Sequence, residues 1–422
     1  MRLLRALAAL MLFVPATCLA QGVLAPGIGP VFRLGTGGAQ AVEPASALYL
    51  NPALLQQFDR SQFSGGMGLL LAERSVDSTV PANAFGPGVP PVPLSGSTRA
   101  DSGDVGVAPF PAGGLVYRPD PEQSLTFGTA FFQVGGLYAN YPSDPSNPIL
   151  SPPPPNGFGV GNRFTLFRVM QIVPTAAWEA CEGLSIGVSP VVNVAGPFPT
   201  SPNPDGSLPV GAGTHPHYGL GFHIGLVAEL GDVNIGFTYK SRQWFETFKL
   251  HSTDNLGFPR LITADIDLPE SYDFSIAWLG LEGLVLTGNL RFVDNDTVDF
   301  FGKSGFRPDG SGIGLGWQST IGGGIGVAYE ACETVTLRAE AVLGQSPVPD
   351  SQAGFNVTSP AHVTHSFATG FSWQMAPNVQ LHFTYLHAPT QSVEGPIQTP
   401  AGAIPGSSVR NTVDIHSVLI AF

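Results

Sequence analysis

Few residue patterns in this chain have the spacing of a catalytic centre. Gly183, Ser185 and Gly187 match the G-x-S-x-G pattern around a serine nucleophile. That nucleophile needs a strand, a sharp turn and then a helix, whereas Ser185 stands just inside an expected strand after a hairpin turn. The chain also carries no phosphate-binding loop and no dinucleotide-binding fingerprint. We therefore expect neither an enzyme nor a cofactor.

Two other groups have side chains that bind metals. His215 and His217 lie in THPHYG, but no cysteine or carboxylate stands beside them at ligand spacing, so a solvated loop is favoured. Asp294, Asp296 and Asp299 in FVDNDTVDFF could hold a calcium ion in a loop, although the glycine and distal glutamate of an EF-hand are missing. The sequence therefore predicts no metal site and leaves calcium at this loop open.

The composition is unusual for a soluble protein. Only 12% of the 422 residues are charged, whereas soluble domains average about 25%. The 53 glycines and 40 prolines could indicate disorder, but a mean hydropathy of +0.18 argues against it. The formal net charge of −13 and the absence of basic runs exclude nucleic acid as a partner.

The amino terminus has the pattern of a secretory signal. Arg2 and Arg5 accompany an apolar run from Leu3 to Val14, and small residues follow before Gln21. We expect residues 1–20 to be a signal peptide that is cleaved after Ala20. The apolar run is shorter than the roughly 20 residues of a membrane-spanning helix, and no later stretch reaches that length without interruption. The mature chain is therefore expected to be exported.

The mature chain divides into two parts by pattern. Residues 21–61 are expected to be irregular apart from one helix, for which Asn51 suits the N-cap and Pro52 the first helical position. Residues 62–422 alternate apolar with small or polar residues, which is the period of β-strands.

Short turns allow the strands to be counted. Six of them separate pairs of strand-like runs: YRPDPEQSL, WEACEGLSI, AELGDVNIG, WLGLEGLVL, YEACETVTL and WQMAPNVQL. One more strand precedes the first pair and one follows the last, and longer loops rich in Pro, Gly, Ser and Asn lie at the opposite ends. About fourteen antiparallel strands with short turns on one side are typical of an outer-membrane β-barrel. A soluble sandwich would show the same period, but export, scarce charge and the unequal loops favour the barrel.

The two cysteines of the mature chain are not expected to pair. Cys181 and Cys332 occupy equivalent EACE turns that lie six strands apart in a ring of about fourteen. They would therefore face each other across the lumen, far beyond the roughly 7 Å that a disulfide allows between Cα atoms.

Several segments, taken in order, resemble the outer-membrane FadL family of long-chain fatty-acid transporters, which includes the TodX-type channels for aromatic hydrocarbons. GTGGAQAVEPASALYLNPALLQQFDRSQFSGG is similar to the family's plug segment, and LTFGTAFFQVGGLYANYP to its third strand. GFTYKSRQWFETFKL and DLPESYDFSIAW resemble its paired seventh and eighth strands, and GQSPVPD and YLHAPTQSVEGPI resemble late segments. The residues that carry the plug motif are Asn51, Pro52 and Ala53, and those of the eighth-strand motif are Leu268, Pro269 and Glu270.

The resemblance implies an all-β fold: a transmembrane antiparallel barrel of about fourteen strands over residues 62–422, plugged by an N-terminal hatch at 21–61. It further implies passive uptake of hydrophobic molecules through a pocket in the barrel. The exit would be a lateral opening where the third strand is interrupted, at Phe132, Gln133, Val134, Gly135 and Gly136. Polar and glycine residues there can supply a bulge or kink.

Family members that carry fatty acids need a cation for the carboxylate. Strand alternation assigns Lys240, Arg242 and Arg338 to the lumen, and these are our candidates, although paired structural charges would give the same pattern. Long-chain fatty acids are favoured slightly over aromatic hydrocarbons as substrate. The partners expected are the substrate, outer-membrane lipid with lipopolysaccharide, and the barrel assembly machinery, and the chain is expected to be a monomer. A general porin and a secreted adhesin or esterase remain the alternatives.

Overall fold

The computed structural model describes residues 37–82, 84, 95–100, 108–120, 122–152, 159, 161–196, 216–253, 258–308, 312–359 and 361–422. The predicted signal peptide 1–20 and the loop histidine His215 lie outside these residues. Within them, no helix is long and apolar enough to cross a membrane.

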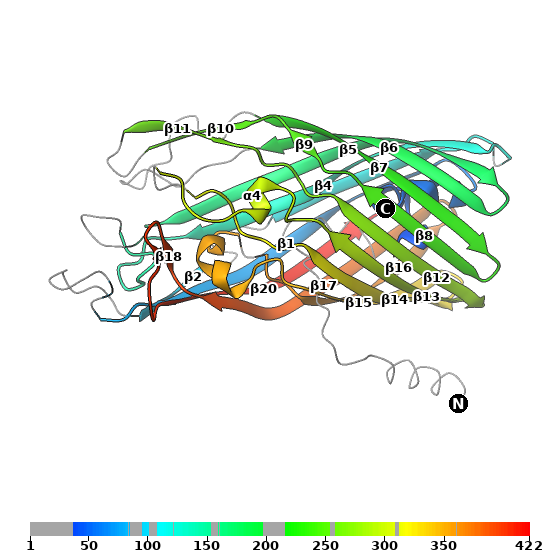
Figure 1. The fold of residues 1–422 in the computed structure, drawn as a ribbon. Coiled ribbons are helices and arrows are strands. Elements are labelled where there is room, and N and C mark those ends of the chain that lie inside the picture. The colour runs from blue at the N-terminus through cyan, green and yellow to red at the C-terminus, as the bar shows by residue number, and fades with distance from the viewer. Residues whose placement is uncertain are drawn as a thin grey trace.

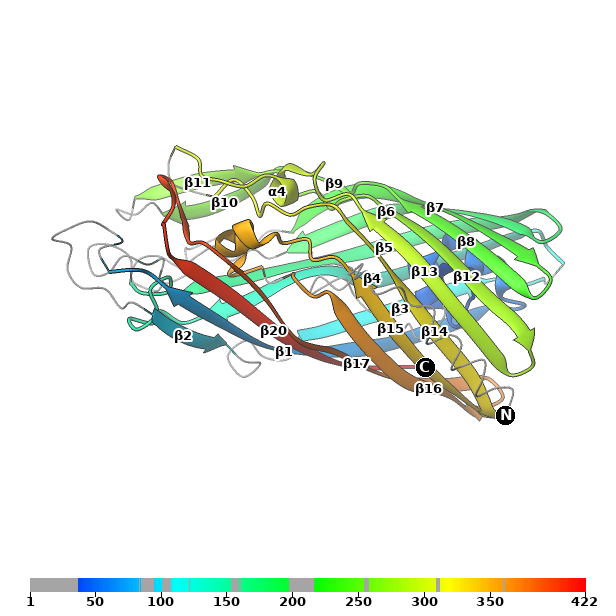
Figure 2. The ribbon, with the colours of Figure 1, turned by 60° about the horizontal axis from the view of Figure 1, so that its bottom comes forward.

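Fourteen strands of the described chain form one closed antiparallel ring, which confirms the predicted barrel (Figures 1 and 2). Neighbours in sequence pair in turn around the ring, and the ring closes where the first strand pairs with both the second and the last. In a closed ring every strand has a neighbour on both sides. The strands are β1 (Gln62–Thr79), β3 (Ala108–Tyr117), β4 (Leu125–Tyr141), β5 (Arg163–Cys181), β6 (Leu184–Gly196), β7 (His217–Leu230), β8 (Val233–Lys240), β12 (Ser271–Leu281), β13 (Leu284–Val293), β14 (Thr320–Cys332), β15 (Val335–Gly344), β16 (His365–Ala376), β17 (Val379–Gly395) and β20 (Ser408–Ala421).

The two ends of the barrel differ as predicted. All six short turns join the expected strand pairs at one end, on the right in Figure 1. Cys181 and Cys332 lie on two of these turns as free, exposed thiols. The long connections at the other end carry the small elements β2 (Ser95–Ala100), β9 (Trp244–Phe245), β10 (Phe248–Thr253), β11 (Pro259–Ala264), α4 (Asp299–Gly302), η4 (Asp350–Asn356), β18 (Gln398–Thr399) and β19 (Gly402–Ala403).

The two faces of the wall differ in chemistry. Along most of β7 the exposed side chains are apolar, namely Tyr218, Leu220, Phe222, Ile224 and Leu226, and the exposed Glu229 lies at the short-turn end. The residues between these apolar ones point inward and are glycine or histidine, and most of them are buried. An apolar outer face is what lipid contact requires, so the scarcity of charge reflects an outer surface that needs none.

The N-terminal segment forms three short elements instead of the single helix expected. The predicted helix at Pro52 is a 3-10 turn, η3 (Pro52–Gln57), capped by Asn51. Before it come η2 (Gly37–Ala39) and a seven-residue helix, α2 (Pro44–Leu50), which the sequence analysis did not predict. Helix α2 begins at a capping glutamate, Glu43, followed directly by proline.

This segment lies inside the barrel. Its three elements contact β1, β3 to β8, β12 and β13, which together make up more than half of the ring. A segment outside a closed wall could not reach so many strands. Its last residues bind the short-turn end, where the Gln56 amide donates to the carbonyls of Ser124 at 2.8 Å and Ala177 at 2.7 Å. The dark blue ribbon in Figures 1 and 2 lies at that end.

Candidate functional site

The hydrogen-bonded wall is interrupted between the second and third strands of the ring. β3 and β4 pair from Tyr117 and Phe127 up to Ala112 and Phe132, and the pairing stops there although both strands continue. β4 remains paired with β5 over its whole length, apart from a register shift between Gln133 and Gly135. The irregularity therefore lies within the predicted stretch 132–136, and it is a bulge with a loss of pairing on one side.

Residues on both strands explain the interruption. On β4, the glycines at 135 and 136 permit the bulge because they have no side chain to pack. On β3, Pro109 and Pro111 have no backbone N–H and so cannot donate to the ladder. Two prolines at alternate positions of a strand are a signal of an interruption or edge, and this signal was not used in the prediction.

The loop after β4 covers the neighbouring wall from inside. The Asn147 amide donates to the carbonyl of Val76 at 2.9 Å and to Thr98 Oγ1 at 3.0 Å, which fastens the loop to β1 and β2. Asp144 accepts from Thr98 at 2.7 Å and from Ser146 at 2.6 Å, and these hydrogen bonds lower the pKa of its carboxyl group. Irregular backbone at membrane depth is stable only where protein covers it or it lines a cavity.

Helix α2 touches β4 directly beside the bulge. The rings of Tyr49 and Phe132 make an edge-to-face contact with centroids 5.1 Å apart, and both residues are buried. The Lys240 ammonium lies 4.0 Å from the centroid of the Tyr49 ring on another side. Tyr49 also lies near enough to interact electrostatically with Arg291, which forms a buried ion pair with Asp273. One tyrosine thus connects the interrupted strand with charges on β8, β12 and β13.

The Asn-Pro-Ala motif anchors the segment to the opposite wall. The Asn51 side-chain amide donates to the carbonyls of Gly38 at 2.8 Å and Leu226 at 3.0 Å. Its Oδ1 accepts from the Ala53 N–H at 3.0 Å, while Pro52 begins η3. The motif therefore closes a turn of the segment and binds it to β7 at once.

Glycines in the wall make room for the segment. A Cβ atom added at any of them would overlap the segment's backbone or the Asn51 side chain; they are Gly114 on β3, Gly187 on β6, Gly225 on β7 and Gly236 on β8. Part of the glycine excess therefore serves close contact between the segment and the lumenal face of the wall.

Glu43 is the buried carboxylate of the segment. It accepts from the backbone N–H groups of Ala45 at 2.7 Å and Ser46 at 2.6 Å, and from the Ser64 hydroxyl of β1. Burial raises the pKa of Glu43 above its ordinary value, although these hydrogen bonds favour the ionised form. The carboxylate both caps α2 and ties it to the first strand.

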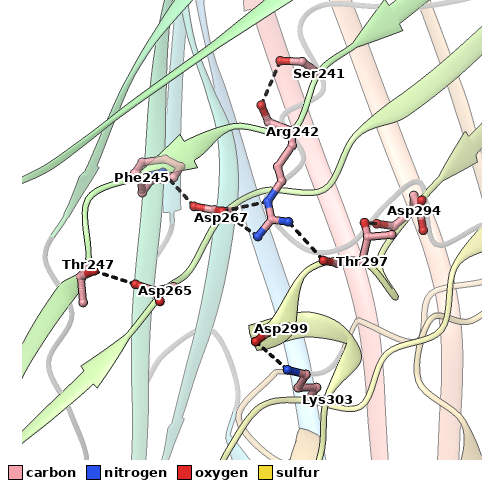
Figure 3. Close-up of polar contacts among 10 residues, drawn as sticks. All are labelled: Ser241, Arg242, Phe245, Thr247, Asp265, Asp267, Asp294, Thr297, Asp299 and Lys303. Atoms are coloured by element: carbon pink, nitrogen blue, oxygen red, sulfur yellow. Dashed lines mark hydrogen bonds and ion pairs between the residues drawn. The ribbon is translucent and has the colours of Figure 1, made fainter.

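The three candidate cations are not brought together. Lys240 meets Tyr49, as described above, and Arg338 Nε donates to Ser372 Oγ at 3.1 Å on the far wall. The alternation that assigned Arg242 to the lumen does not reach it, because β8 ends at Lys240. Arg242 instead forms an ion pair with Asp267 at 2.8 Å and donates to the carbonyl of Thr297 at 3.2 Å (Figure 3).

The remaining predicted residues have structural contacts. Leu268 exchanges two backbone hydrogen bonds with Gln243, and the Glu270 carboxylate accepts from Tyr239 at 2.7 Å and Tyr272 at 3.0 Å. Leu268, Pro269 and Glu270 thus lead into β12 and fix its start to the chain beyond β8.

The aspartates of the candidate calcium loop have protein partners. Asp299 forms an ion pair with Lys303 at 2.7 Å (Figure 3). Asp294 accepts from the Ser319 hydroxyl at 2.8 Å. Within the described chain, the one group of three histidine, cysteine or acidic side chains close enough to share an ion lies elsewhere, on the outer wall.

Comparisons with known proteins agree with this architecture. The model of the family described as outer membrane protein transport protein (OMPP1/FadL/TodX) matches residues 27–422. No curated protein sequence matches the chain.

Solved structures share the fold at low sequence identity. A Pseudomonas aeruginosa FadL homologue has 14% identity and a TM-score of 0.64, with 97% of this chain and 98% of that chain covered. The P. putida toluene transporter TodX has 15% identity and a TM-score of 0.66, with 94% and 98% covered. The Ralstonia pickettii toluene transporter TbuX has 18% identity and a TM-score of 0.58, again with 94% and 98% covered.

Proposed function

Because the chain belongs to the outer membrane protein transport family (OMPP1/FadL/TodX), we propose that it is a passive channel that takes up hydrophobic small molecules. The barrel lies in the outer membrane, with its apolar outer face toward lipid. The observation that carries the proposal is the interrupted wall beside Phe132, reached from inside by the aromatic contact with Tyr49.

The lumen beyond the N-terminal segment suits an apolar solute. Buried apolar side chains of one cluster come from the third and fourth strands of the ring and from the loop between them: Tyr141, Leu150, Phe167 and Val169. An apolar substrate gains about 0.8 kcal/mol for each CH₂ removed from water. Such a path selects by hydrophobicity and needs no energy coupling.

We propose that residues 21–61 are the hatch of residues 62–422, the barrel. In the closed state the hatch fills the short-turn half of the lumen, and its helix α2 holds Phe132 in place. Movement of α2 would release Phe132 and free the lateral exit at Phe132–Gly136. Lipid directly outside that exit would then accept an apolar substrate.

The substrate class is fatty acids or aromatic hydrocarbons, and fatty acids require a lumenal cation. Lys240 is the candidate that lies beside the hatch, whereas the Arg242 guanidinium is engaged by Asp267. Membrane lipid with lipopolysaccharide and the barrel assembly machinery are the other partners proposed for a monomeric chain. We propose that uptake involves neither a catalytic step nor a bound cofactor.

Uptake by cells that lack their own carriers of this class tests the proposal. Cells that produce the mature chain should accumulate labelled oleate or toluene faster than cells without it, and glucose uptake should be unchanged. Deletion of residues 22–61 should convert a poorly conducting barrel into one with large, steady single-channel currents. If the intact protein already conducts as an open pore and passes glucose, a general porin replaces this function.

A further inference from the structure

A cluster of two histidines and an aspartate bridges β17 and β20. His387 Nε2 lies 3.2 Å from Asp414 Oδ1, and His416 Nε2 lies 3.1 Å from the same oxygen. The two imidazole rings stack with centroids 4.4 Å apart and planes inclined by 8°. One potential ligand atom from each residue thus lies within 4.8 Å of the other two.

The cluster faces outward, at the boundary between two kinds of surface. Asp414 and His416 alternate with buried residues of β20 and share the face of the exposed Arg410 and Ile420. Toward the short turns this face is apolar, with Met67, Leu69, Phe383, Tyr385, Val418 and Ile420 in adjacent register. Toward the long loops it is polar, with Ser75, Asp77, Ser392, Glu394, Arg410 and Thr412. The cluster therefore stands where the lipid-facing belt ends, accessible from the aqueous side.

The ligand atoms have the spacing of a metal shell. Bonds of about 2.0–2.1 Å to nitrogen or carboxylate oxygen place neighbouring tetrahedral ligands roughly 3.3 Å apart, close to the two observed distances. Two imidazoles and a carboxylate are ligands that Zn²⁺ and similar divalent transition-metal ions prefer over Ca²⁺ or Mg²⁺. The three side chains would leave one position open for water or a lipid oxygen.

Supporting hydrogen bonds orient the ligands. Tyr385 Oη lies 2.7 Å from His416 Nδ1, and Thr390 donates to Asp414 Oδ2 at 2.7 Å. With the imidazole proton on Nδ1, His416 donates to the tyrosine oxygen and presents the Nε2 lone pair. Partners of this kind fix ring orientation at metal sites.

The neighbouring backbone gives such a site a mechanical role. The pairing of β17 with β20 shifts register between Ala388 and Gln391, directly after His387. A bound cation would bridge β17 and β20 directly beside this irregularity in their pairing.

We propose that His387, Asp414 and His416 form a binding site for a divalent transition-metal ion that joins β17 to β20 at the outer boundary of the lipid belt. The ion replaces hydrogen bonds between the same side chains, and loading requires the two stacked rings to tilt out of their near-parallel planes so that both Nε2 lone pairs point at it.

Titration of the purified, EDTA-treated full-length mature protein with Zn²⁺ in detergent tests the site by calorimetry. We expect one saturable equivalent in the wild type and at least tenfold weaker binding in His387→Ala, His416→Ala and Asp414→Asn. Tyr385→Phe removes only the supporting hydroxyl and should weaken binding about tenfold. His365→Ala is the matched control, because His365 is a half-exposed histidine on the outer face of β16, and its binding should equal that of the wild type.

Thermal unfolding of the same proteins separates binding from folding. Zn²⁺ should raise the midpoint temperature of unfolding of the wild type and of His365→Ala, but not that of the three ligand variants. If Asp414→Asn fails to assemble, His387→Gln keeps an N–H donor toward Asp414 and removes one metal ligand. Absence of saturable binding in the wild type, or equal binding in wild type and ligand variants, would overturn the proposal and leave a hydrogen-bonded cluster.

Discussion

The ring of Tyr49 stands edge-to-face against the ring of Phe132, with centroids 5.1 Å apart, at the point where β4 loses its pairing with β3. Tyr49 belongs to the N-terminal segment and Phe132 to the wall. Because both rings are buried, neither can move far without the other. This contact makes the state of the segment and the state of the wall mutually dependent.

Replacement of Tyr49 by alanine should therefore loosen the segment. An aromatic pair contributes about 0.5–1.5 kcal/mol beyond its buried area, which corresponds to a roughly 2- to 10-fold larger population of the displaced segment. Single-channel recordings should show more frequent conducting events for Tyr49→Ala than for the wild type. Tyr49→Phe keeps the ring and is the control. An equally low frequency of conducting events in all three proteins would contradict the coupling.

Alanine at Gly225 should displace the segment from the opposite wall. Its Cβ would overlap Asn51 Oδ1, so we expect a loss of about 1–3 kcal/mol, as for other overpacked sites. Gly288→Ala is the matched control, because its Cβ would meet Ile276 Cγ2 at an ordinary 3.5 Å. Protease cleavage within residues 37–61, followed by mass spectrometry, should be faster only in Gly225→Ala.

Restoring hydrogen-bond donors to the interrupted strand should close the wall. One variant, Pro109→Val with Pro111→Val, returns two backbone N–H groups to β3. A second variant, Gly135→Val with Gly136→Val, should stiffen β4. Each pair of substitutions should lower uptake of the hydrophobic probe several-fold. Heat-modifiable gel mobility should stay at the wild-type value, since it reports barrel assembly. Unchanged uptake in both variants would place the exit elsewhere.

Acid should destabilise the barrel through His362, a buried residue of the long connection before β16. Burial, with a further contribution from the positive charge of Arg74, lowers the pKa of His362 to about 4. Its neutral ring donates from Nε2 to the carbonyl of Gln391 at 3.2 Å, and Nδ1 has no partner among the described residues.

The unfolded chain binds this proton at the ordinary histidine pKa of about 6.5. The contribution of neutral His362 to the free energy of unfolding is therefore complete above pH 6.5, and it is lost as the pH falls from 6.5 through about 4. Thermal midpoints measured across that range should fall more for the wild type than for His362→Asn. Parallel curves for the two proteins would show that this histidine does not titrate as the structure implies.

Much of the barrel could be predicted because its determinants are local. The period-two alternation fixes which side chains face lipid, and turn residues such as Gly231 and Gly283, both at positive φ, fix where hairpins reverse. Strand number, strand order and the inequality of the two ends followed from these patterns. Helix α2 was missed because seven residues buried on all sides show no amphipathic period.

The contacts of the lumen could not be predicted in the same way. Alternation places Lys240 on the inner face, yet only the curvature of the closed ring and the path of the segment put it beside Tyr49. Alternation also stopped short of Arg242, because the strand ended two residues earlier.

Local sequence patterns were thus enough to predict a lipid-facing barrel of about fourteen strands. Which residues of distant strands meet could be seen only in the folded barrel, because such contacts depend on the register of every strand pair around the ring. The meeting of Tyr49 with Phe132, the fit of Asn51 against Gly225 and the cluster of His387 with Asp414 all arise in this way.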